Sequence, residues 1–196
     1  MPTLYIMRHG ETVWNREHRM QGWSDSELTT NGVESAKRMQ GRLARLSLDA
    51  IYSSPSLRTR TTAQIVRGDH LGPVQYDERI KEMNMGEWEG QTQAEINEKY
   101  PEQSFAFWNT PHTFTTVHGE LFEDVRTRVA LFLEAIKHVS GNILIVTHAI
   151  VIKTLLQMAK GNSLEQFWNP PFIHHSTMTY FELNEQLEYI GVVNND

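Results

Sequence analysis

The segment at residues 142–161, NILIVTHAIVIKTLLQMAKG, constrains the fold more than any other, because it changes its pattern across a single histidine. Residues 143–147 have the continuous apolar character of a parallel strand buried on both faces. Residues 149–160 have the length and pattern of the helix that follows such a strand. A unit of this kind predicts an α/β domain built on a mostly parallel sheet.

Strand-like and helical patterns alternate along the rest of the chain. The predicted strands are residues 4–7, 49–54 and 74–77, and the predicted helices are residues 30–46, 55–66 and 119–139. The last helix carries one apolar stripe, at Phe122, Val125, Val129, Phe132, Ile136 and Val139. Asn31 and Glu34 resemble a capping box in the first helix. Residues 176–184 and 186–193 predict a hairpin, whereas residues 105–119 are rich in aromatics and have no clear period, which is typical of a functional cover.

The composition excludes several classes of protein. At 196 residues, 39% of them hydrophobic, the chain is long enough for one domain and short for two. The absence of cysteine excludes disulfides, thiolate catalysis and cysteine zinc sites, and it fits a cytoplasmic location. Because the first predicted strand comes so early, we expect no signal peptide, and no apolar run reaches the roughly 18 residues of a membrane span. A net charge of −6 argues against nucleic-acid or anionic-membrane binding, so an anion site would need local arginines.

Arg8, His9 and Gly10 follow directly on the predicted strand at residues 4–7. A glycine lets backbone N–H groups approach a ligand, and an arginine supplies a cationic fork for phosphate or carboxylate. A histidine can act as a base, a nucleophile or a metal ligand. By itself the tripeptide fits a structural role as well as it fits an anion-binding site.

Residues in three further segments make an anion site more plausible than a structural role. His148 ends the strand at residues 143–147, and ligands of open α/β sheets bind at such carboxyl ends. The helix after His148 begins with N–H groups that favour anions. Arg58 and Arg60 lie in the first turns of another helix, where only one of them is expected to face the strand ends. Glu82 and Glu87 are alternative proton donors, although most glutamates are simply solvated.

Five ordered motifs resemble the histidine phosphatase (phosphoglycerate mutase-like) superfamily over essentially the whole chain, most closely its small PhoE-type broad-specificity phosphatases. The motifs are LYIMRHGETVWN, RMQGWSDSELTTNG, SSPSLRTRTTA, KEMNMGEWEG and IVTHAIVIKTLL. The resemblance implies a three-layer αβα sandwich with a mostly parallel central sheet. It also implies a small helical or loop cap over the carboxyl ends of the strands, formed by an insertion at about residues 91–119 in a single domain spanning residues 1–196.

The same resemblance implies a phosphomonoester hydrolase that acts on small phosphorylated metabolites. His9 matches the nucleophile that becomes a phosphohistidine, and Glu82 matches the acid that protonates the leaving oxygen and then activates water. Arg8, Arg58 and His148 match the phosphate pocket.

Four other positions match the lining of the phosphate or substrate pocket: Asn15, Gln21, Gly22 and Ala149. Ala149 departs from the usual glycine, and we expect little loss of activity from it. The resemblance implies no metal and no other cofactor. His174 and His175 could suggest a metal, but adjacent residues of a strand point to opposite faces, so we interpret them as structural or rim residues.

Two alternatives remain open at this stage. One is phosphoglycerate mutase activity, which is disfavoured because mutases are longer and have an E-R-H-Y-G stretch where this chain has EMNMG. The other is a non-catalytic module that binds phosphorylated ligands. The physiological substrate, the oligomeric state and the role of residues 105–119 in specificity are not given by the sequence.

Overall fold

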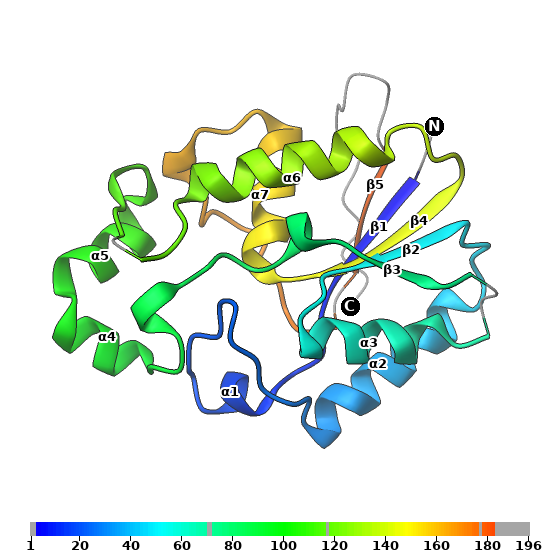
Figure 1. Ribbon diagram of the computed structural model, residues 1–196, viewed down its shortest axis with the longest axis horizontal. Coiled ribbons are helices and arrows are strands. Elements are labelled where there is room, and N and C mark those ends of the chain that lie inside the picture. The colour runs from blue at the N-terminus through cyan, green and yellow to red at the C-terminus, as the bar shows by residue number, and fades with distance from the viewer. Residues whose placement is uncertain (1–2, 70–71, 117, 177, 183–196) are drawn as a thin grey trace.

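The computed structural model describes residues 3–69, 72–116, 118–176 and 178–182 (Figure 1). Its sheet has the strand order β3-β2-β4-β1-β5. The strands are β1 (Thr3–Arg8), β2 (Ala50–Ser53), β3 (Val74–Tyr76), β4 (Asn142–Thr147) and β5 (Met178–Glu182). All neighbouring strands are parallel except β5, which runs antiparallel to β1. The predicted mostly parallel sheet is therefore confirmed.

Helices cover both faces of this sheet. The helices are α1 (Val13–Arg16), α2 (Thr30–Leu43), α3 (Leu57–Arg67), α4 (Gln93–Lys99), α5 (Pro101–Asn109), α6 (Phe122–Ile136) and α7 (Ala149–Lys160). The described residues also form short 3₁₀ helices at Glu78–Ile80, Gly86–Trp88, Pro111–Thr113 and Leu164–Gln166. No helix in the described ranges is long and apolar enough to cross a membrane.

Alternate residues of β4 belong to two separate cores, as the period of two in a strand requires. Leu144 and Val146 pack in a cluster with residues of α2 and α3. Ile143 and Ile145 pack in a larger cluster with residues of α6 and α7. Figure 1 shows these two helix pairs on opposite sides of the sheet. The three-layer αβα sandwich is confirmed.

The helix ends differ from the sequence predictions for local reasons. The capping box with Asn31 and Glu34 is wrong, because Thr29 is the N-cap of α2 and its side chain accepts the N–H of Gly32 at 3.0 Å. Gly32 has no side chain that could complete a box. The helix at 119–139 begins three residues later than predicted, because the Asp124 carboxylate accepts the N–H of Leu121, the N-cap residue, at 2.8 Å. The apolar stripe of α6 is buried as predicted from Phe122 to Ile136, and Val139 is partly buried.

The structure also describes parts of the predicted hairpin and of the predicted cover. β5 confirms a strand within residues 176–184, whereas the second strand of the predicted hairpin, 186–193, lies outside the described residues. Residues 105–119, predicted to be irregular, include the end of α5 and the 3₁₀ helix Pro111–Thr113. α4, α5 and this 3₁₀ helix lie together at one side of the molecule (Figure 1).

Phe107 of α5 is the centre of an aromatic cluster. It is fully buried, and its ring centroid lies 5.4 Å from that of Trp88, 5.2 Å from that of Phe114 and 5.3 Å from that of Trp168. These rings come from separate segments of the chain and surround Phe107 on several sides. The residues next to Phe107 in α5 therefore do not need to form one apolar stripe.

Replacing Phe107 by alanine is expected to lower the free energy of unfolding by about 3–5 kcal/mol, because it leaves a cavity within the cluster. Phe105 on the same helix is 62% exposed, so Phe105→Ala is expected to change it by no more than about 0.5 kcal/mol. Urea unfolding of both variants measures the difference. Equal losses would contradict the cluster as a source of stability.

Candidate active site

Three strand ends meet at the carboxyl edge of the sheet. Arg8 pairs with Thr147 and Ser53 pairs with Val146, so the residues that follow these strands lie next to one another. The N–H of His9 donates to the carbonyl of Thr147 at 3.1 Å. The ring centroids of His9 and His148 are consequently 5.4 Å apart, and the two rings are arranged edge to face. The two strands that carry these histidines, β1 and β4, are neighbours in the sheet, so the histidines converge.

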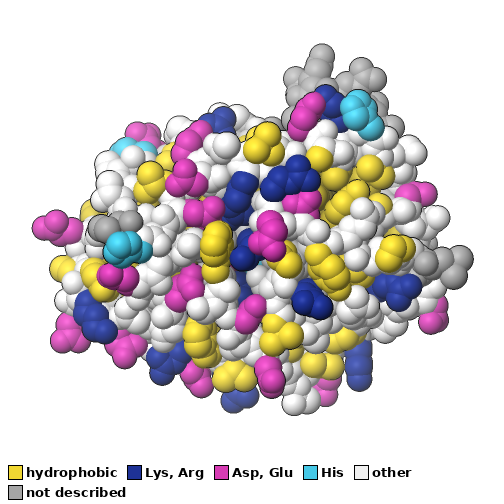
Figure 2. Space-filling view, viewed as in Figure 1, with side chains coloured by type: hydrophobic (Ala, Val, Ile, Leu, Met, Phe, Trp, Pro, Cys, Tyr) yellow, Lys and Arg dark blue, Asp and Glu magenta, His cyan; other side chains and the backbone are white. Residues whose placement is uncertain are grey.

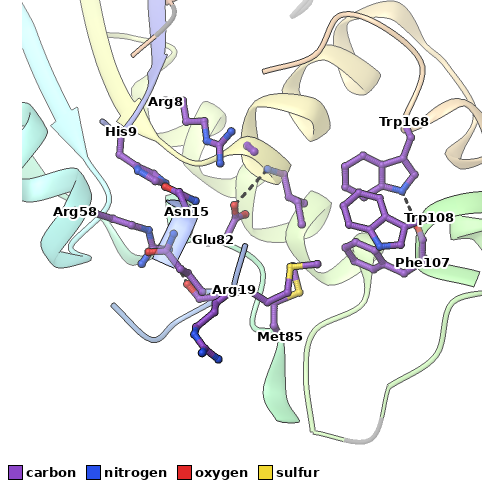
Figure 3. Close-up of a pocket in the computed structure, with 15 residues that line it drawn as sticks. Arg8, His9, Asn15, Arg19, Arg58, Glu82, Met85, Phe107, Trp108 and Trp168 are labelled. Carbon is purple, nitrogen blue, oxygen red and sulfur yellow. Dashed lines mark hydrogen bonds between the residues drawn. The ribbon is translucent and has the colours of Figure 1, made fainter. Parts of the chain in front are cut away.

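A cavity of about 230 Å³ opens at this edge. It is lined by Arg8, His9, Asn15, Arg19, Met20, Gln21, Gly22, Arg58, Glu82, Met85, Phe107, Trp108, Ala149, Ile150 and Trp168. Figure 3 shows the charged side chains on one side of the cavity and the rings of Phe107, Trp108 and Trp168 on the other. Figure 2 shows basic side chains inside a narrow cleft at the middle of this face. The chain is acidic overall, yet the cleft presents local positive charge.

His9 has the environment of a neutral imidazole. Its side chain is 3% exposed, and burial lowers its pKa well below 6.5, with further lowering from Arg58 and Arg8. Its Nδ1 lies 2.8 Å from the carbonyl oxygen of Gly10. A carbonyl can only accept, so Nδ1 carries the proton and Nε2 keeps a free lone pair. This is the tautomer that a nucleophilic histidine needs.

Cationic groups surround His9 and retain unused hydrogen-bonding capacity. Arg8 Nη1 donates to the carbonyl of Ile173 at 2.7 Å. Burial lowers the pKa of Arg8 to about 10, which is still far enough above 7 that the guanidinium stays charged at neutral pH. Arg58 is 1% exposed and donates to the carbonyls of Gly22 and Ser24 at 2.7 and 2.8 Å.

Four buried nitrogens near His9 have no hydrogen-bond partner within the part of the chain that the structure describes. They are Nε of Arg8, Nε of Arg58, Nδ1 of His148 and Nε2 of His175. His148 is wholly buried beside His9 and does not itself line the cavity, and its Nε2 lies 2.8 Å from the hydroxyl oxygen of Ser54. An unpaired buried polar group costs about 1–3 kcal/mol, so groups of this kind gathered at one place indicate a ligand, here an anion.

Glu82 is the carboxyl group of the cavity. It is 9% exposed, and Met83 N–H donates to its Oε1 at 2.9 Å while Ile150 N–H lies 3.5 Å from its Oε2. Burial raises its pKa, opposed by the Met83 N–H and by the two arginines. A raised pKa favours the protonated form that a proton donor requires. Its alternative, Glu87, is exposed, accepts a hydrogen bond from the Tyr100 hydroxyl at 2.8 Å and does not line this cavity.

The structure also distinguishes the two arginines of α3. Arg58 faces the cavity, whereas Arg60 is exposed and stacks on Tyr76 with 5.1 Å between its guanidinium carbon and the ring centroid. The expectation that only one of them faces the strand ends is met. Ala149 opens α7 without a positive φ, so its methyl group causes no backbone strain there.

Sequence reasoning missed several groups near His9. Arg19, Met20, Met85 and Ile150 line the cavity, as do Phe107, Trp108 and Trp168. Phe107 and Trp108 lie in the segment that was predicted only to be a cover. His175 has its ring centroid 6.1 Å from that of His9, and burial lowers its pKa to about 3. His175 lies in a turn, so the strand alternation expected for His174 and His175 is wrong. The structure places no three potential metal-ligating side chains together among the residues it describes.

Comparisons with known proteins identify the family of the chain. Residues 4–196 match the family model described as histidine phosphatase superfamily (branch 1). The chain is 35% identical to phosphoserine phosphatase 1 of Hydrogenobacter thermophilus over 172 residues, which cover 86% of this chain and 81% of that protein. It is 32% identical to the probable phosphoglycerate mutase GpmB of Escherichia coli over 163 residues, which cover 82% of this chain and 76% of that protein. The solved structure of Bacillus stearothermophilus YhfR superposes with a TM-score of 0.94 at 41% identity, covering 99% of this chain and 96% of that one.

Proposed function

The chain belongs to the histidine phosphatase superfamily, and from this premise we propose that it hydrolyses small phosphate monoesters through a phosphohistidine formed on His9. One observation carries the proposal. A neutral His9 lies among buried, partly unpaired nitrogens of Arg8, Arg58 and His148, with the buried carboxyl of Glu82 in the same cavity. A nucleophile, cationic groups and an acid for a two-step phosphoryl transfer thus lie close together, which supports the proposal.

In the first step the Nε2 lone pair of His9 attacks phosphorus. The P–N bond forms while the ester P–O bond breaks, and Glu82 gives its proton to the departing oxygen. Arg8 and Arg58 neutralise the phosphoryl oxygens as their charge shifts in the transition state. The hydrogen bond from Nδ1 to Gly10 holds the imidazole in position throughout.

In the second step a water molecule attacks the phosphohistidine. The carboxylate of Glu82 accepts a proton from this water, the P–N bond breaks, and inorganic phosphate leaves. His9 returns to its neutral form and Glu82 to its acid form. The positive charge in both steps comes from the side chains of the cavity.

On the opposite wall of the cavity, the exposed ring of Trp108 can contact the alcohol part of the ester, and the buried ring of Phe107 packs behind it. Phe107 and Trp108 come from α5, so we propose that residues 91–119 act as a cap within one domain and help to set the leaving-group preference. Apolar rings beside an anion site favour esters with a partly apolar leaving group, and the cavity volume of about 230 Å³ favours small metabolites. The lack of cysteine fits a cytoplasmic location for this activity.

A panel of phosphorylated metabolites, including phosphoserine and 3-phosphoglycerate, tests the assignment of hydrolysis over isomerisation. One relative is a phosphoserine phosphatase and another a probable mutase, so both activities need measurement in the same samples. We expect release of inorganic phosphate from several esters to exceed transfer between the hydroxyls of phosphoglycerate. Faster isomerisation than phosphate release would favour the mutase, and binding without turnover would favour the non-catalytic module.

A further inference from the structure

The loop at residues 22–25 provides most of the contacts that hold Arg58. Arg58 Nη2 donates to the carbonyl of Gly22 at 2.7 Å, and Nη1 donates to the carbonyl of Ser24 at 2.8 Å and to Asp25 Oδ1 at 2.5 Å. Asp25 Oδ2 also accepts the N–H of Leu57, the first residue of α3, at 2.6 Å. The position of the Arg58 guanidinium therefore depends on the position of this loop.

Glu89 holds the same loop from its other side. Its Oε1 accepts the N–H of Trp23 at 2.7 Å, and its Oε2 accepts the N–H and the hydroxyl of Ser24 at 2.9 and 2.5 Å. Oε1 also accepts the N–H of Met85 at 3.2 Å. A carboxylate that accepts four hydrogen bonds makes the strong, charge-assisted type, which fixes the donors relative to one another. Glu89 does not line the cavity, so it has no direct contact with the ester.

Gly22 shows how closely the loop approaches Glu89. Its φ is +54°, a region that favours glycine, and a Cβ added to it would lie 2.2 Å from Glu89 Oε1. The loop backbone and the carboxylate therefore fit together only with glycine at this position. This contact gives Gly22 a role in the packing of the loop as well as in the lining of the cavity.

A further bond joins the loop to the proposed proton donor. The indole Nε1 of Trp23 donates to the backbone carbonyl of Glu82 at 2.9 Å. The ring of Trp23 also lies beneath the ammonium group of Lys81, with 4.0 Å between the nitrogen and the ring centroid. The loop thus contacts both Arg58 and the main chain that carries Glu82.

We propose that Glu89 is a positioning residue for the phosphoryl-transfer site. Its carboxylate fixes residues 22–25, and through them it sets the place of the Arg58 guanidinium relative to His9. The inference rests on the proposed function, because it assigns Arg58 to the phosphoryl oxygens. It differs from a purely structural role in one respect: the effect of removing the carboxylate must depend on Arg58.

A double-mutant cycle tests this dependence. Glu89→Gln keeps the shape but places an amide N–H₂ against backbone donors, so the loop must shift. We expect kcat/KM to fall by about 10–100-fold, the size associated with a misplacement of about 1 Å at a catalytic group. The Ki of inorganic phosphate, as a competitive inhibitor, should rise in parallel. In the Arg58→Ala background the same substitution is expected to change both quantities by less than about threefold, since contacting residues are not additive.

Controls separate this result from a loss of folding. Glu87→Gln, two residues away and exposed, should leave kcat/KM and the Ki of phosphate unchanged. If Glu89→Gln does not fold, Ser24→Ala removes only the hydroxyl bond to Glu89 and should show a smaller effect with the same dependence on Arg58.

Equal factors with and without Arg58 would overturn the positioning role. The unmodified protein could instead fail to hydrolyse any ester while phosphate binding still shows that the effect of Glu89→Gln depends on Arg58. That result would overturn the proposed function but not the positioning role of Glu89.

Discussion

Replacing His9 by alanine is expected to abolish turnover of p-nitrophenyl phosphate and acid-labile phosphoryl labelling of the protein. The substitution removes the only atom proposed to bond to phosphorus, so we expect kcat to fall by at least about 10⁴-fold. The arginines and His148 remain, and inorganic phosphate should therefore still bind. Steady-state kinetics and labelling with a radioactive ester measure the two effects.

The matched control is His138→Ala, because His138 is exposed in the turn after α6 and is not among the residues lining the cavity. Its activity and labelling should equal those of the unmodified protein. Labelling that persists in His9→Ala would place the phosphoryl group on another residue and contradict the assignment of the nucleophile.

Glu82→Gln is expected to slow hydrolysis of alkyl phosphates by about 10²–10⁴-fold, the usual contribution of a general acid. Aryl phosphates should be slowed less in the first step, because p-nitrophenolate leaves without needing a proton. Comparison of kcat/KM for the two substrate types measures this selectivity. Equal slowing of both would argue that Glu82 is not the acid.

The same variant makes a prediction about pH. Burial raises the pKa of Glu82, and the first step needs its protonated form, so kcat/KM should fall as pH rises through that raised value. Burial lowers the pKa of His9, and the nucleophile must be neutral, so its acidic limb should lie below pH 6.5. In Glu82→Gln the alkaline limb should disappear while the acidic limb stays, and a profile with an unchanged alkaline limb would assign that limb to another group.

The sequence predicted the part of the site that depends on sheet topology. His9 and His148 each follow a continuous apolar run, and the carboxyl ends of adjacent parallel strands meet at one edge. The helical geometry of α3 likewise required that Arg58 and Arg60 face different directions. The helical pattern alone did not say which of the two lies inside, because that depends on the loop at residues 22–25, which is distant in sequence. Only the family resemblance selected Arg58.

Other features of the site depend on tertiary contacts, which leave no periodic pattern in the sequence. Glu82 and Glu87 lie in one irregular segment, and only tertiary packing buries the first and exposes the second. Phe107 packs against Trp88, Phe114 and Trp168 from different parts of the chain, so the cap did not show a helical stripe. Residues that touch partners on several sides are the ones that periodicity identifies least well.

The stereochemical course at phosphorus tests the central claim most directly. A phosphate monoester made chiral at phosphorus with oxygen isotopes, with its phosphoryl group transferred to an acceptor alcohol, reports how many displacements occur. Attack by His9 followed by attack of the acceptor gives two inversions, so the account predicts net retention of configuration. Net inversion would show a single direct displacement on the ester and would contradict a phosphohistidine intermediate on His9.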